Sequence, residues 1–204
     1  MFREGMTGIR INLSHVMLSD CADDIKMIKT AAKECGITPK ILIDMQGPEL
    51  RIGVLSEPVT LCEGGNFILG ENGVPVDPLI VRHLESGQEI LLDDGRILAE
   101  VLSKSGGSVS LEVKRGGVVQ GRKSIAIKDH TTDLPALTEC DLKNLALAGE
   151  FGITGVMQPF VRSADDLKFL RRVLNENGGS EIKIYAKIEN MAGVDNLESF
   201  FSLF

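Results

Sequence analysis

The sequence has no long hydrophobic run and only four cysteines, and both absences narrow what the protein can be. Its longest stretch without a charge near the middle, residues 151–161, ends at Arg162 and is shorter than the roughly 18 apolar residues that a membrane helix needs. Cys21, Cys35, Cys62 and Cys140 are too widely spaced for a CxxC metal or redox motif. Residues 1–5 also show no apolar signal-peptide core. We therefore expect no membrane association and a reducing, cytoplasmic location.

A shortage of positive charge excludes a second class of protein. The 22 Lys and Arg residues against 29 Asp and Glu residues leave a net charge of −7. Because nucleic-acid affinity depends largely on clustered Lys and Arg, we expect no nucleic-acid partner. The hydrophobic share of 43% and the charged share of 25% are close to globular averages and favour a folded chain with a real core.

Strand patterns alternate with helix patterns before and after a central segment, residues 54–130, that lacks this alternation. Period-two alternation over residues 9–14 predicts a strand, helical periodicity follows over 21–35, and the apolar run 40–44 predicts a buried strand. The alternation resumes at residue 138, with strands expected at 155–158 and 183–188. This order predicts a parallel α/β sheet, either open or closed into a barrel.

The central segment, residues 54–130, contains short β-type runs separated by glycine pairs, which indicates a separate small β domain. The other domain is then 1–53 plus 131–204. Helix starts within it carry their own signals, since Thr138 with Asp141 and Ser163 with Asp166 have the spacing of capping boxes.

Polar side chains gather at the carboxyl ends of the predicted parallel strands, where α/β enzymes place their sites. They are Arg10, Asn12 and Ser14 on the first strand, Asp44 on the second, and Lys187 and Glu189 on the last. Residues two apart share one face of a strand, so these groups are expected to meet over one pocket. For any single residue, a strand end turned to solvent is the alternative.

Five short motifs, in order along the chain, resemble motifs of the pyruvate kinase family. They are Arg10–His15, Asp44–Arg51, Asp93–Gly95, Asp133–Glu139 and Lys187–Asn190. The resemblance covers nearly the whole chain, and chance agreement of five ordered motifs is improbable. It implies a partial (β/α)8 TIM-type barrel interrupted by a small inserted β-barrel domain that acts as a mobile lid. It also implies transfer of a phosphoryl group from phosphoenolpyruvate to ADP, giving pyruvate and ATP in glycolysis, by a parent protein that is a homo-oligomer.

The resemblance also implies roles for the phosphate and magnesium ligands. Arg10 would hold the phosphate of phosphoenolpyruvate, and Lys187 would offset charge on the phosphoryl group and the enolate. Glu189 would be a Mg²⁺ ligand.

The cation and nucleotide sites follow from the same resemblance. Asn12, Ser14, Asp44 and the carbonyl of Met45 would bind K⁺. Arg51, His15 and Lys123 would contact nucleotide phosphates, with a solvated surface lysine as the alternative for Lys123.

The chain also departs from the family pattern. Met45-Gln46 stands where the family has Thr-Lys, which removes a cation near the pocket. The segment that brings a second Mg²⁺ carboxylate has no counterpart here, so we expect an incomplete fragment or a degenerate copy that is inactive alone. The alternatives are a non-catalytic relative that binds phosphoenolpyruvate or nucleotide, and a metal-dependent lyase on a similar barrel.

Overall fold

The chain forms two compact units in a computed structural model that describes residues 1–14, 16–128, 134–201 and 203. One unit, here called the sheet unit, is made of Met1–Pro48 and Leu134–Phe204. The other, here called the β unit, is Glu49–Asp133. The sequence patterns predict the domain boundaries between residues 53 and 54 and between residues 130 and 131.

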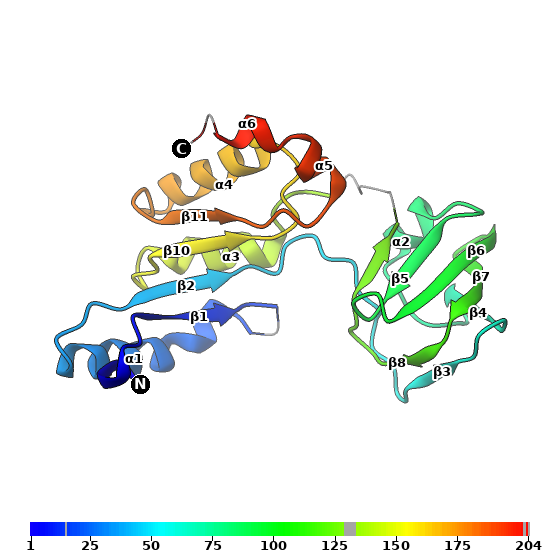
Figure 1. Cartoon of the computed structure of the whole chain (residues 1–204), viewed down its shortest axis with the longest axis horizontal. Helices are drawn as coiled ribbons and strands as arrows, with labels where there is room; N and C mark the ends of the chain where they lie inside the picture. Colours follow the sequence, from blue (N-terminus) through cyan, green and yellow to red (C-terminus); the bar gives the residue numbers. More distant parts are fainter. Residues whose placement is uncertain (15, 129–133, 202, 204) are drawn as a thin grey trace. The chain divides into compact units, whose positions relative to one another are not determined.

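The sheet unit is built on four strands that all run in parallel (Figure 1). In spatial order these are β1 (Gly8–Asn12), β2 (Lys40–Asp44), β10 (Gly155–Gln158) and β11 (Lys183–Ala186). The predicted parallel α/β architecture is therefore confirmed. The last strand ends at Ala186, two residues before its predicted end. Within the described residues the sheet has β1 and β11 as its two edges, so it is not a closed barrel.

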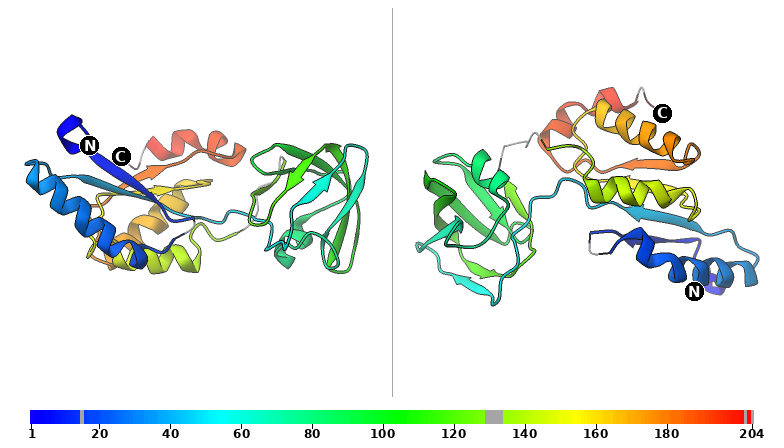
Figure 2. Two further views of the ribbon diagram at one scale, coloured as in Figure 1. Left: turned by 90° about the horizontal axis from the view of Figure 1, so that it is seen from below. Right: turned by 180° about the vertical axis from the view of Figure 1, so that it is seen from behind.

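Helices cover one face of this sheet. Helices α1 (Ala22–Glu34), α3 (Glu139–Ala148) and α4 (Ala164–Glu176) lie in front of the strands in the right-hand view of Figure 2. Their apolar residues bury one core with the strand residues that point the same way, among them Ile43 and Val156, which are opposite each other in register. This core fixes which strand residues face away from the helices.

Short elements complete the sheet unit. They are the 3₁₀ turns η1 (Phe2–Glu4) and η2 (Leu18–Cys21) and the helices α5 (Met191–Asp195) and α6 (Leu197–Phe201). Phe200 of α6 packs with Leu167 of α4 in a small second cluster. None of the helices in the part of the chain that the structure describes is long and apolar enough to cross a membrane.

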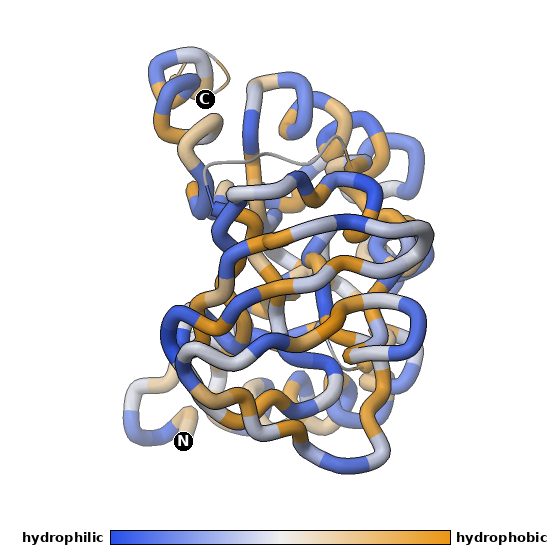
Figure 3. Tube along the Cα trace, turned by 90° about the vertical axis from the view of Figure 1, so that its right-hand side faces the viewer, coloured by the Kyte–Doolittle hydropathy of each residue, from blue (hydrophilic) through white to orange (hydrophobic). Residues whose placement is uncertain are grey.

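The β unit consists of two antiparallel sheets around one apolar core. The larger has the order β4 (Asn66–Gly70), β7 (Ser108–Arg115), β6 (Ile97–Ser105), β5 (Glu89–Leu92) and β9 (Ile125–Ile127), and the smaller pairs β3 (Val59–Leu61) with β8 (Gly117–Val119). One short helix, α2 (Pro78–His83), completes it. Apolar stretches along the strands alternate with hydrophilic turns (Figure 3). The described strands of this unit thus form two sheets, not one closed barrel.

Candidate active site

The sheet register brings the predicted polar residues of the first two strands together. Asn12 lies opposite Asp44 in the β1–β2 pair, and Arg10 is two residues before Asn12 on the same face. Arg10 Nε donates a hydrogen bond to Asp44 Oδ2 at 2.9 Å, and Arg10 Nη2 donates to the same oxygen. Asp44 is 3% exposed, whereas the Arg10 side chain keeps 53% of its surface in solvent. The guanidinium therefore has free donors for an incoming anion.

The last strand adds a lysine and a second carboxylate to this face. Met157 of β10 lies opposite both Asp44 and Tyr185, and Lys187 follows Tyr185 by two residues. Lys187 Nζ lies 3.2 Å from Asp44 Oδ1 and 3.4 Å from Glu189 Oε1. Four charged side chains, from β1, from β2 and from the segment just after β11, thus meet where the strands end. Two are cationic and two anionic, so the cluster can hold an anion and a cation together.

Glu189 is held at this edge by the backbone. Its Oε2 accepts a hydrogen bond from the N–H of Phe160, a residue with a positive φ of 53°. Its side chain is 37% exposed, and its Oε1 faces the ammonium of Lys187. One exposed carboxylate suits Mg²⁺, which usually takes one or two carboxylates and completes its shell with water and substrate phosphate. The described residues contain no group of three His, Cys, Asp or Glu side chains that could hold a metal without substrate.

Asn12 and Asp44 lie opposite each other at the ends of β1 and β2, and both carry side-chain oxygens. Asp44 Oδ1 is buried and accepts no hydrogen bond from the described residues, because its contact with Lys187 has the distance of an ion pair without hydrogen-bond geometry. Asn12 Oδ1 accepts the N–H of Ser14 at 3.1 Å and keeps a second lone pair. The side chain of Met45 is buried in the core, so this residue can contribute only its main chain. A carboxylate oxygen that accepts no hydrogen bond, together with the amide oxygen of Asn12, is the kind of oxygen set that suits a hard monovalent cation.

The predicted nucleotide residues Arg51 and Lys123 belong to the β unit. Arg51 Nη1 donates to the carbonyl of Arg122 at 2.7 Å, and Nη2 pairs with Glu49. Lys123 Nζ lies 2.8 Å from Asp93 Oδ1, and hydrogen bonding to this lysine lowers the pKa of Asp93. Both cations are therefore already engaged with acceptors of their own unit. His15, the third predicted nucleotide residue, lies outside the described residues.

Sequence reasoning missed the buried amide of Gln158 and the buried contact that Asp141, expected only as part of a capping box, makes with the loop after β2. Asp141 is fully buried at the start of α3, where Oδ2 caps the helix through Thr138 and Oδ1 accepts the N–H of Gly47 at 3.4 Å. The helix start is thereby tied to the loop that follows β2. Gln158 is also fully buried, and both polar atoms of its amide lack hydrogen-bond partners within the described residues. Its register places it on the helix-facing side of the sheet with Val156, away from the charged cluster.

A parallel α/β sheet with charged residues gathered at the carboxyl ends of its strands is typical of the class of α/β proteins that place a ligand site at that edge. Comparisons with known proteins narrow the class. The family model "Pyruvate kinase, barrel domain" matches residues 1–203. Relatives named pyruvate kinase include those of Chlamydia pneumoniae, 31% identical over 98% of this chain, and Aeropyrum pernix, 33% identical over 97%. A third, from Geobacillus stearothermophilus, is 32% identical over 97%.

The chain belongs to the pyruvate kinase family, as the motifs predict. It spans 43% of the length of the first two of these relatives and 36% of the third.

Proposed function

We propose that this chain carries the phosphoenolpyruvate- and metal-binding part of a pyruvate kinase active site. The whole protein would transfer the phosphoryl group of phosphoenolpyruvate to ADP, giving pyruvate and ATP, and would act in the cytoplasm as a homo-oligomer. The observation that carries the proposal is the meeting of Arg10, Asp44, Lys187 and Glu189 at one edge of the sheet. Phosphoryl transfer depends mainly on positioning and charge neutralisation, and these are the groups that such a site needs.

Each side chain then has a distinct task. Arg10 binds the phosphate with the donors that Asp44 leaves free, because a guanidinium fork matches phosphate oxygens. Asp44 holds Arg10 and Lys187 in place. The ammonium of Lys187 offsets the negative charge on the phosphoryl group in transfer and on the enolate left behind. Glu189 is the protein ligand for Mg²⁺, which when bound neutralises phosphate charge.

The remaining predicted residues serve the monovalent cation and the nucleotide. Asn12, Ser14, Asp44 and the carbonyl of Met45 form an all-oxygen set suited to K⁺, and Asp44 Oδ1, which accepts no hydrogen bond from the described residues, supports this assignment. Arg51, His15 and Lys123 are proposed as contacts to the nucleotide phosphates. The β unit would act as the lid that carries the first and last of these.

The 204-residue chain is expected to bind phosphoenolpyruvate without turning it over, since Glu189 is the one carboxylate available for Mg²⁺ in the cluster. The test is calorimetric titration of the chain with phosphoenolpyruvate, with and without Mg²⁺. We expect Arg10→Gln to weaken binding at least tenfold and Glu189→Gln to abolish the Mg²⁺ dependence. Arg3→Gln, which removes an exposed arginine of η1 ahead of the amino end of β1 and outside the cluster, is the charge-matched control and should bind as the wild type. Equal binding by Arg10→Gln and the control would contradict the proposal.

A non-catalytic relative that binds phosphoenolpyruvate or nucleotide is the second candidate. It is favoured by Gln46, which stands in the position of a family lysine. Pyruvate formation by a protein that includes this chain and the remainder of its reading frame, assayed with Mg²⁺ and K⁺, separates the two. Turnover supports the kinase, and saturable binding without turnover supports the non-catalytic relative.

A further inference from the structure

Helix α1 carries a stripe of lysines that has no part in the proposed active site. Lys26, Lys29 and Lys33 are spaced by three and four residues. At about 100° per residue they fall within about 60° of the helix circumference. The three acidic residues of the helix lie outside this arc. The stripe is therefore a cationic strip on one side of the helix.

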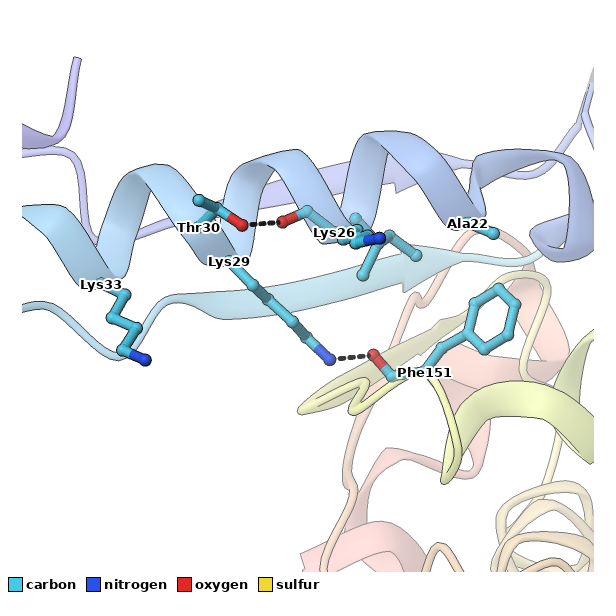
Figure 4. A pocket seen from close by; sticks show the side chains of 7 residues that line it. Ala22, Lys26, Lys29, Thr30, Lys33 and Phe151 are labelled. Carbon is cyan, nitrogen blue, oxygen red and sulfur yellow. Dashed lines mark hydrogen bonds between the residues drawn. The ribbon is translucent and has the colours of Figure 1, made fainter.

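This strip lines a cavity of about 350 Å³ (Figure 4). The apolar part of the wall comes from Ala22 and Ile25 of α1 and from Phe151, in the loop after α3. Small-molecule sites typically have volumes of roughly 300–1,000 Å³ and combine an apolar wall with a few polar groups. The cavity thus has the size and the mixed lining of a small ligand site.

One lysine fixes the wall of the cavity. Lys29 Nζ donates to the carbonyl of Phe151 at 2.7 Å, which ties α1 to the loop after α3. The next residue, Gly152, has a φ of +65°, and a Cβ added there would lie 2.7 Å from the same ammonium. The glycine therefore leaves the space that Lys29 occupies.

The other two lysines are not neutralised by the protein. The ammonium groups of Lys26 and Lys33 make no hydrogen bond or ion pair with the described residues, and both lysines are like-charged helical neighbours of Lys29. Such pairs at spacings of three and four destabilise a helix. A cluster of this kind in a chain of net charge −7 creates a local positive potential beside the cavity. An anionic ligand would remove the repulsion.

We propose that this cavity binds a phosphate-bearing small molecule with a planar aromatic part. Lys26 and Lys33, whose Cα atoms lie about 10 Å apart along the helix, would attract a phosphate dianion by their positive charge, and an aromatic ring would pack on the apolar wall of Ile25 and Phe151. The inference is independent of the proposed kinase function, because no residue is shared between the two sites.

The test uses the 204-residue chain, labelled with ¹⁵N and titrated with 1-naphthyl phosphate while amide shifts are followed by NMR. We expect saturable shifts in α1 and around Phe151. Lys26→Gln/Lys33→Gln should weaken binding at least tenfold, and higher salt should weaken wild-type binding. The control, Lys143→Gln/Lys183→Gln, also removes two exposed lysines of the sheet unit and should bind as the wild type. Neutral 1-naphthol should bind at least tenfold more weakly than the phosphate.

Three results would overturn the proposal. The first is the absence of saturable shifts in α1. The second is equal affinity of the Lys26→Gln/Lys33→Gln chain and its control. The third is a set of shifts confined to the ends of β1, β2 and β11, which would place the probe at the proposed active site instead.

Discussion

Replacing Asp44 by Asn tests the central ion cluster through the stability of the sheet unit. The buried carboxylate of Asp44 accepts two hydrogen bonds from Arg10 and pairs with Lys187. Hydrogen bonds to charged groups contribute about 1.5–3 kcal/mol each. The Arg10 and Lys187 side chains are 53% and 27% exposed and stay solvated after the loss, which places the effect at the low end of that range. We expect Asp44→Asn to cost about 2 kcal/mol of unfolding free energy.

The assay is urea unfolding followed by tyrosine fluorescence. The chain has one tyrosine and no tryptophan, and Tyr185 lies on β11 on the same face as Asp44, so the signal reports the sheet unit. The control is Asp165→Asn, which removes a surface carboxylate that is 86% exposed and pairs with Lys168. Exposed pairs contribute at most about 1 kcal/mol, and we expect about 0.5 or less here. Equal unfolding midpoints for the two variants would refute the assignment of Asp44 as the buried centre of the cluster.

Three further predictions concern caps, a tight loop and pH. Thr138→Ala should cost about 1 kcal/mol of unfolding free energy, because the Thr138 side chain caps α3. Ser163→Ala should cost under about 0.5 kcal/mol, because Ser163 makes no capping hydrogen bond at the start of α4. Urea unfolding midpoints of the two variants measure the difference. Gly47→Ala should lower the melting temperature more than Gly36→Ala does. Both glycines have a positive φ, but only at Gly47 would an added Cβ clash, because it would lie 2.4 Å from Cγ of Pro159. The hydrogen bond with Lys123 makes the pKa of Asp93 lower in the folded chain than its unfolded value of about 3.9. The ionised Asp93 therefore stabilises the folded chain fully above about pH 3.9, and this contribution is lost as the pH falls through the lower folded pKa. Between pH 6 and pH 2.5 the wild type should therefore lose more unfolding free energy than Asp93→Asn, and equal losses would contradict the ion pair.

Local patterns predicted the sheet unit well because its elements have strong local signals. The apolar run 40–44 and the segment 155–158 are the strands β2 and β10, and the capping box at Thr138 is confirmed. The second expected capping box is wrong. Asp166 Oδ2 instead accepts hydrogen bonds from the N–H and Nε of Arg162, and this competition cannot be read from spacing alone.

Contacts between distant segments explain what the sequence did not show. The compact β unit begins at Glu49 because residues 50–53 pair with residues 122–125, about 70 positions later. The meeting of Arg10, Asp44 and Lys187 could be predicted, because the carboxyl ends of parallel strands lie at the same edge of a sheet. Their ion pairs depend on strand order, with β10 between β2 and β11, which no local pattern contains. The buried amide of Gln158 gave no signal because polar residues at strand ends are common.

The most direct test of the central claim, that Arg10, Asp44, Lys187 and Glu189 form one ligand site, is an NMR titration of the ¹⁵N-labelled chain with phosphoenolpyruvate and Mg²⁺. We predict amide shifts at the ends of β1, β2 and β11 that saturate together with a single dissociation constant. Shifts that avoid these strand ends, or that titrate with separate constants at the different strands, would contradict the account.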